Sequence, residues 1–168
     1  DDGMIVGTGV VSGVVKAYAM TPVVVTGTLS IEGYGALLNG VQADVEVTDG
    51  SSTLESLTVT LGPGGSFRVV PGVTGNVTLK FSALAGLRRA VAVNLGAGSS
   101  VGNNVSLING DVDQDNEVGP GDFGALATAF LSVDGDPNWN LLADLDGDGE
   151  VGPGDFGILA TNFLTSGD

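Results

Sequence analysis

The sequence DVDQDNEVGPGDFGALATAFL at residues 111–131 decides the C-terminal part of the fold, because it returns without a gap as DLDGDGEVGPGDFGILATNFL at residues 144–164. Each copy opens on a run of regularly spaced acidic residues and continues into an apolar stretch. An internal repeat of this kind predicts two copies of one small structural unit that bury their apolar faces together.

The spacing of the acidic residues predicts two calcium sites. A twelve-residue loop surrounds Ca²⁺ with oxygen ligands from positions 1, 3, 5, 7, 9 and 12, where position 7 uses its backbone carbonyl and position 9 often uses a water. Mg²⁺ is the weaker alternative, because it resists an all-protein cage. We expect one ion in the loop at 111–122 and one in the loop at 144–155. The expected metal residues are Asp111, Asp113, Asp115, Glu117 and Asp122 in the first loop, and Asp144, Asp146, Asp148, Glu150 and Asp155 in the second.

Other positions of the loops support this prediction. Position 6 requires a left-handed backbone, and Asn116 and Gly149 are the residue types that tolerate it best. Position 8 is Val118 or Val151, which can lie beneath the loop. The apolar residues that follow recur at the spacing of one helical face, so two short helices are expected to pack face to face. These residues are Phe123, Leu126, Ala127 and Phe130 in the first copy, and Phe156, Leu159, Ala160 and Phe163 in the second.

Residues 110–164 resemble a type I dockerin module, which consists of two calcium loop–helix units without an entering helix. The resemblance implies a calcium-folded module that binds a cohesin domain on another protein. In dockerins the residues that read the cohesin lie at loop positions 10 and 11. Both copies have Pro-Gly there, at Pro120-Gly121 and Pro153-Gly154.

The charge distribution limits the partners. The net charge is −15, and residues 110–168 hold thirteen acidic residues and no basic residue. Such a segment folds readily only when cations neutralise it. The charge argues against nucleic acid and against anionic membrane surfaces as partners. No run is apolar and long enough to suggest insertion into a membrane.

The residues before the repeat predict an antiparallel β-sandwich. Several segments alternate between apolar and polar residues, which is typical of half-buried strands, and Gly62-Pro63-Gly64-Gly65 predicts a hairpin-type turn. Residues 62–95 resemble the prealbumin-like sandwiches of carboxypeptidase regulatory-like domains, which implies a non-catalytic spacer or adhesion fold. We therefore expect a β-sandwich domain at 1–109 and a small α-helical calcium module at 110–168. The expected strands are 23–31, 41–48, 57–61, 66–70, 76–81, 90–95 and 101–107.

Residues 1–20 are apolar, rich in glycine and surplus to a sandwich that begins near Val23. One interpretation is an ordinary first strand. The other is a strand donated to the sheet of a neighbouring copy, which would give a filament because head-to-tail donation does not close.

The sequence offers no activated nucleophile. It contains no His and no Cys, and its dense carboxylate pairs all lie in the calcium loops, so we expect no enzyme. A start at Asp1 without a leader suggests a processed, extracellular chain. We expect a calcium-binding structural protein that assembles with copies of itself in a surface layer or filament. The alternatives are an adaptor that binds a cohesin-like domain and a carbohydrate-binding module, in which Trp139 could stack on a sugar.

Overall fold

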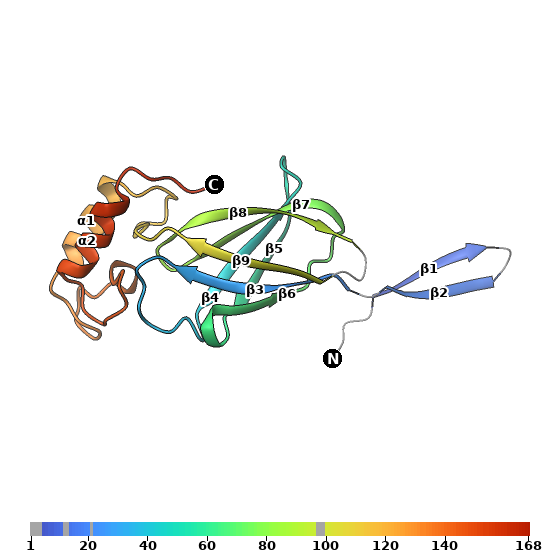
Figure 1. Ribbon diagram of the computed structural model, residues 1–168, viewed down its shortest axis with the longest axis horizontal. Helices are drawn as coiled ribbons and strands as arrows, with labels where there is room; N and C mark the ends of the chain where they lie inside the picture. Colours follow the sequence, from blue (N-terminus) through green and yellow to red (C-terminus); the bar gives the residue numbers. More distant parts are fainter. Residues whose placement is uncertain (1–4, 12–13, 21, 97–99) are drawn as a thin grey trace.

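The computed structural model describes residues 5–11, 14–20, 22–96 and 100–168, and it is mainly a β-sandwich with two small helices at its C-terminal end (Figure 1). The strands are β1 (Ile5–Val11), β2 (Val14–Met20), β3 (Val24–Ile31), β4 (Gln42–Thr48), β5 (Thr53–Thr60), β6 (Ser66–Val69), β7 (Gly75–Ala83), β8 (Gly86–Leu95) and β9 (Ser100–Leu107). The helices are α1 (Pro120–Ala129) and α2 (Pro153–Asn162), with 3₁₀ turns η1 (Pro63–Gly65) and η2 (Leu141–Ala143).

The sandwich consists of one sheet in the order β6-β3-β9 and a second in the order β5-β4-β7-β8. The expectation of an antiparallel sandwich is wrong for one pair, since β3 and β9 are parallel and both point toward the helices (Figure 1). Parallel pairing needs a long crossover, and five strands of the sandwich lie between β3 and β9 in the sequence. The other pairs are antiparallel, as expected.

Each of the seven expected strands is present, although some limits differ. β5 begins at Thr53 rather than Leu57, and β8 begins at Gly86 rather than Ala90. The turn at residues 62–65 is a 3₁₀ turn that links strands of different sheets, so it is not a hairpin turn.

Alternate residues of the strands form the sandwich core. Val45 and Val47 of β4 are fully buried between the sheets, and Phe67 of β6 lies 5.1 Å from Phe81 of β7 between ring centroids. The remaining buried members are Val23, Val25, Leu29, Ile31, Ala43, Leu61, Val69, Val77, Leu79, Ala83, Val93, Leu95, Val105 and Leu107.

The first two strands form a separate hairpin. β1 and β2 are antiparallel, from Ile5 opposite Met20 to Val11 opposite Val14, and neither pairs with any other strand that the structure describes. Figure 1 shows the hairpin projecting from the end of the sandwich opposite the helices. The described part of residues 1–20 therefore differs from an ordinary first strand of the sandwich, because β1 and β2 pair with each other.

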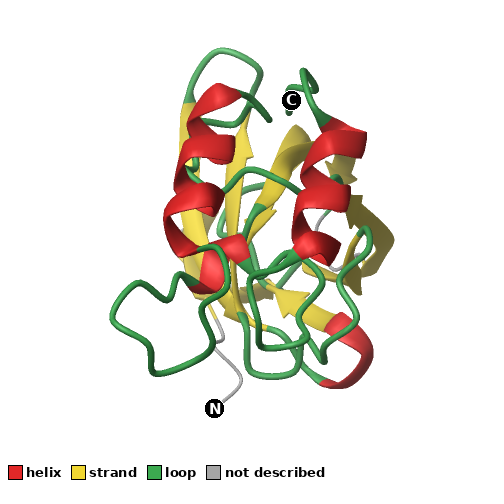
Figure 2. Ribbon diagram, turned by 90° about the vertical axis from the view of Figure 1, so that its left-hand side faces the viewer, coloured by secondary structure: helices red, strands yellow, loops and turns green. Residues whose placement is uncertain are grey.

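The C-terminal segment has its own buried cluster, in which Leu126 of α1 and Leu159 of α2 meet the valines beneath the loops. Ala85 and Leu87, at the start of β8, belong to the same cluster, so the segment packs on the end of the sandwich. Figure 2 shows the two helices side by side at this end. Among the described residues, no helix is both long and apolar enough to cross a membrane.

Candidate metal centre and helix face

Each acidic loop gathers three of its predicted carboxylates into one cluster. Asp111, Asp113 and Asp122 have ligand atoms within 4.8 Å of one another, and Asp144, Asp146 and Asp155 form the equivalent cluster in the second loop. The remaining predicted residues lie outside these clusters: Asp115, Glu117, Asp148 and Glu150. The backbone N–H of Glu117 donates to Asp115 Oδ1 at 2.9 Å, and the same bond links Glu150 and Asp148 at 2.9 Å, so both pairs shape the loop.

The carboxylate at position 12 holds each loop closed. Asp122 Oδ1 accepts the N–H groups of Val112 and Asp113 at 2.6 and 3.0 Å, and Oδ2 accepts that of Gly119 at 2.6 Å. The second loop repeats the pattern on Asp155 with the same three distances. With two N–H donors on Oδ1 and one on Oδ2, the second oxygen keeps a lone pair for a cation.

The surroundings of Asp111 are compatible with a cation in the first loop. This side chain is 6% exposed, and its Oδ1 has no hydrogen-bond partner, while Oδ2 accepts the N–H of Asn116 at 3.1 Å. A buried carboxylate oxygen without a partner is costly. Burial, reinforced by the neighbouring carboxylates, raises the pKa of Asp111 to about 6. A bound divalent cation would satisfy the free oxygen and offset both effects.

In the second loop, too, the pKa values of clustered carboxyl groups are raised. Burial raises the pKa of Asp144, although the N–H groups of Gly149 and Gly147 counteract the rise, and burial also raises the pKa of Asp146. Three acidic side chains in so small a volume repel one another unless a cation lies between them. The donor set contains only oxygens, which suits Ca²⁺ or Mg²⁺ rather than a soft metal.

Backbone geometry agrees with the residue types in the loops. Asn116 and Gly149 have φ values of 70° and 89°, as predicted for position 6. Position 11 has a packing role that the sequence did not reveal. A Cβ atom on Gly121 would overlap Asp113 Oδ2, and one on Gly154 would overlap Asp146 Oδ2. These glycines therefore let the position-3 carboxylate approach the helix.

Backbone hydrogen bonds at position 8 of each loop join the two repeats. Val118 donates its N–H to Thr165 O at 2.8 Å and accepts that of Leu164 at 2.7 Å, so the first loop bonds to the chain after α2. Val151 makes the matching bonds to the chain after α1, accepting from Leu131 at 2.7 Å and donating to Ser132 at 2.9 Å. Both valine side chains are buried, as predicted. Each loop thus depends on the other repeat.

The expected helix core is only partly correct. Leu126 and Leu159 are buried, but the four phenylalanines of the predicted faces remain 39–49% exposed. Ala127 and Ala160 are exposed too. The valines under the loops and Leu145 fill the space that the phenylalanines were expected to occupy. We call the exposed set the aromatic face: Phe123, Ala127, Phe130, Leu131, Phe156, Ala160, Phe163 and Leu164.

The aromatic face contains side chains from both helices. The rings of Phe123 and Phe156 meet edge to face, with centroids 6.2 Å apart. Leu131 and Leu164 are 69% and 80% exposed at the ends of the two repeats. The helical spacing of these residues was visible in the sequence, but spacing alone does not distinguish a buried face from an exposed one.

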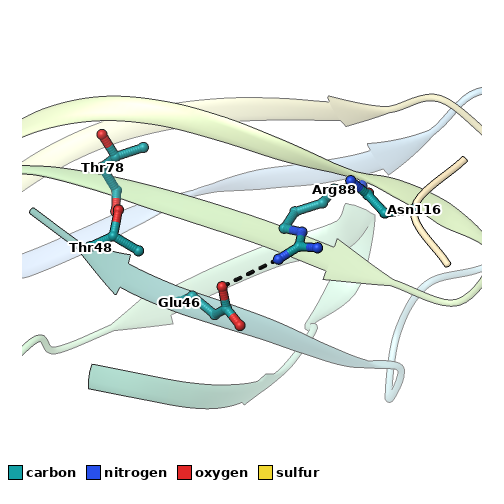
Figure 3. A network of polar contacts seen from close by, with 5 residues as sticks. All are labelled: Glu46, Thr48, Thr78, Arg88 and Asn116. Carbon is teal, nitrogen blue, oxygen red and sulfur yellow. Dashed lines mark hydrogen bonds and ion pairs between the residues drawn. The ribbon is translucent and has the colours of Figure 1, made fainter. Parts of the chain in front are cut away.

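The loops also bond to the sandwich. The Arg88 N–H donates to Asn116 Oδ1 at 2.8 Å, and the Arg88 guanidinium lies 3.5 Å from Glu46 Oε2 on β4 (Figure 3). At the second loop, Asn109 Nδ2 donates to Leu145 O at 2.6 Å, and the Gly35 N–H donates to Asp146 O at 2.7 Å. Both loops are therefore held against the end of the sandwich.

Comparison with known proteins identifies the fold. No known protein family matches the sequence, and no curated protein matches it. Among solved structures, the chain is similar to a chain of a type II cohesin–X–dockerin complex from Acetivibrio cellulolyticus, an N-terminal interface mutant. The TM-score is 0.67 and the identity 20%, over 86% of this chain and 97% of that one. A C-terminal interface mutant of the same complex gives a TM-score of 0.66 at 20% identity, with the same coverage of both chains.

The aligned share is larger than residues 1–109, so the similarity includes part of residues 110–168 as well as the sandwich. At this identity the similarity concerns the fold alone. The chain is thus a β-sandwich protein with a small C-terminal helix pair.

Proposed function

We propose that this chain is a non-catalytic, extracellular assembly protein that binds two calcium ions and docks to a protein partner through its aromatic face. The observation that carries the proposal is the position of this face. It lies on, and directly after, the two helices whose first turns contain the clustered Asp122 and Asp155. Calcium would therefore act by holding the docking surface in shape.

Calcium would fold residues 110–168 as a unit on the end of the sandwich. In the first loop, Asp111, Asp113 and Asp122 would hold the ion, and the equivalent residues would hold the second. Because the ions bind the folded form only, they would stabilise it by mass action. Residues 110–168 contain thirteen acidic residues and no basic residue, so their charge needs such neutralisation.

The partner proposed for the aromatic face is a cohesin-like domain. Large exposed apolar patches commonly mark interaction sites. The fold similarity to a chain of a cohesin–X–dockerin complex supports this class of partner. Pro120-Gly121 and Pro153-Gly154 offer little side chain for recognition, so the phenylalanines that follow them would make the contacts instead.

Calorimetry against a panel of type I and type II cohesin domains, with calcium and with chelator, tests the proposal. Binding is expected only with calcium. Replacing both Phe123 and Phe156 by Ser should weaken it at least about tenfold, since burying one such side chain contributes about 1.5–3 kcal/mol. Val70→Ser is the matched control, because Val70 is 38% exposed but lies on the sandwich. Binding that is equally strong in the double variant would contradict the proposed face.

Carbohydrate binding is the less supported alternative. Trp139, the single tryptophan, is half-buried and packs against the C-terminal cluster rather than standing free for a sugar. Affinity electrophoresis on polysaccharides distinguishes this alternative from docking to a protein.

A further inference from the structure

We infer that the β1–β2 hairpin of one copy adds to the free edge of β5 in a second copy, which joins the chains through a shared β-sheet. This inference goes beyond the proposed function, because it involves neither the calcium loops nor the aromatic face. It names the two surfaces that would meet between identical chains, the β1–β2 hairpin of one copy and the β5 edge of the other.

The first half of the contact is the hairpin. Its two strands of seven residues each pair only with one another among the described strands, so each has an outer edge open to a further strand. An isolated two-stranded hairpin is at best marginally stable in water. The two strands contain one charged residue, Lys16, and no proline. The features that protect exposed strand edges are therefore almost absent.

The second half is the edge of β5. This strand pairs with β4 on one side and with no described strand on the other. The other long edges are partly covered. On β8, the Ala90 N–H donates to Asp168 Oδ2 at 2.9 Å, and Arg88 O accepts the N–H of Asp168 at 2.9 Å. The end of β9 is bonded to the start of β8 through Leu87 and Ile108.

Apolar side chains along β5 are also more exposed than expected for a strand with neighbours on both sides. Leu57 and Val59 pair across the sheet with Val45 and Ala43, which are fully buried, yet Leu57 and Val59 themselves are only half-buried. Leu54 is 46% exposed. β5 contains no Lys, Arg or Pro. Its one acidic residue, Glu55, already accepts the Gly72 N–H at 2.9 Å.

The geometry favours a second copy as the partner. The hairpin points away from its own sandwich, so it cannot add to its own β5 in this arrangement (Figure 1). Seven-residue strands match the eight residues of β5. The described hairpin strands bring no acidic residue, so their approach to a chain of net charge −15 is not opposed by repulsion. Because the two surfaces differ, the contact is head-to-tail and can extend into an open chain.

Site-directed cross-linking of the full chain tests this inference. The sequence contains no cysteine, so single substitutions give a clean background. Ala17→Cys on the hairpin is mixed with Thr58→Cys on β5, and a short bismaleimide joins thiols that lie close together without demanding one register. The control mixture pairs Ala17→Cys with Asn94→Cys, which lies exposed on β8. Circular dichroism verifies that each variant is folded.

The expected result is a cross-linked species of twice the 16.6 kDa chain mass in the first mixture and little in the control. Equal yields in both mixtures, or a uniform monomer in light scattering at every concentration, would overturn the inference. Ala17→Pro in an otherwise unchanged chain should also reduce self-association. The Phe123→Ser, Phe156→Ser double variant should cross-link normally, so a failure of the cohesin proposal would be seen separately.

Discussion

Asp113 and Gly121 lie so close together that the chain has no room for a side chain at residue 121, because a Cβ there would overlap Asp113 Oδ2. Gly154 and Asp146 repeat this relationship in the second loop. The glycine at position 11 therefore leaves the space that the position-3 carboxylate occupies. This placement explains why position 11 is a glycine in both repeats.

Gly121→Ala should weaken calcium binding to the first loop. The methyl group would displace the Asp113 carboxylate, and overpacking of this kind costs about 1–3 kcal/mol, so a loss of about fivefold to 150-fold in affinity is expected. Calorimetric titration with calcium measures the change. Gly124→Ala, one turn further along α1, is the control, because a Cβ there meets nothing within 4 Å. Equal affinities for the two variants would show that the close approach has no effect on the ion.

Asp122→Ala should destabilise the protein even without calcium. The substitution removes an acceptor for three backbone N–H groups, and the bond from Val112 is buried, so leaving that donor unsatisfied costs about 1–3 kcal/mol. Thermal unfolding of metal-free protein should show a clear decrease in Tm. Asp134→Ala, at an exposed position between the repeats, serves as the control and should leave Tm nearly unchanged.

The stability of the metal-free protein should fall as the pH rises toward neutrality. Burial raises the pKa of Asp111 from 3.8 to about 6, so the folded state binds this proton more tightly than the unfolded chain. The contribution is fully present below the unfolded pKa and is lost as the pH rises through 6. The raised pKa values of Asp113, Asp144 and Asp146 act in the same direction.

Calcium should reverse this trend, because the ion requires the ionised carboxylates and binds better as they lose their protons. Melting curves between about pH 4 and pH 7, recorded with metal-free and with calcium-loaded protein, compare the two slopes. The two sets of Tm values should diverge as the pH rises. Parallel slopes would argue against a cation at the Asp111 cluster.

Asn116→Gly should loosen the first loop from the sandwich while sparing the loop itself. Glycine accepts the left-handed backbone at residue 116, where φ is 70°, but it lacks the Oδ1 that accepts the Arg88 N–H. Hydrogen exchange at the Arg88 amide should become faster, whereas calcium affinity should change little. Unchanged exchange would show that this bond does not hold the sandwich to the loop.

Sequence patterns predicted where the strands lie better than they predicted which strands pair with each other. The alternation in residues 41–48 identified β4, because one face of that strand lies in the core. No local pattern predicts that β9 pairs in parallel with β3, since that contact joins segments far apart in the chain. β8 was expected to begin at residue 90, after Arg88 and Arg89. Both are in the strand, and Arg89 lies 3.7 Å from the carboxylate of Asp168.

The two repeats also contain some features that the sequence predicted and others that it did not. Spacing and residue type predicted the acidic loops, the left-handed position 6 and the buried valines at position 8. The exposure of Phe123 and Phe156 could not be predicted, because it depends on which side chains from the two repeats and from β8 form the buried cluster. The binding of calcium, the domain boundary at Gly110 and the docking partner remain predictions.

Native mass spectrometry of the full chain, metal-free and after addition of calcium, tests the central proposal most directly. We predict a shift by the mass of two calcium ions, reduced to one ion in a variant with Asp144, Asp146 and Asp155 all replaced by Ala. A chain that binds no calcium, or one whose bound ions are unaffected by that triple substitution, would contradict the proposed calcium-held docking surface.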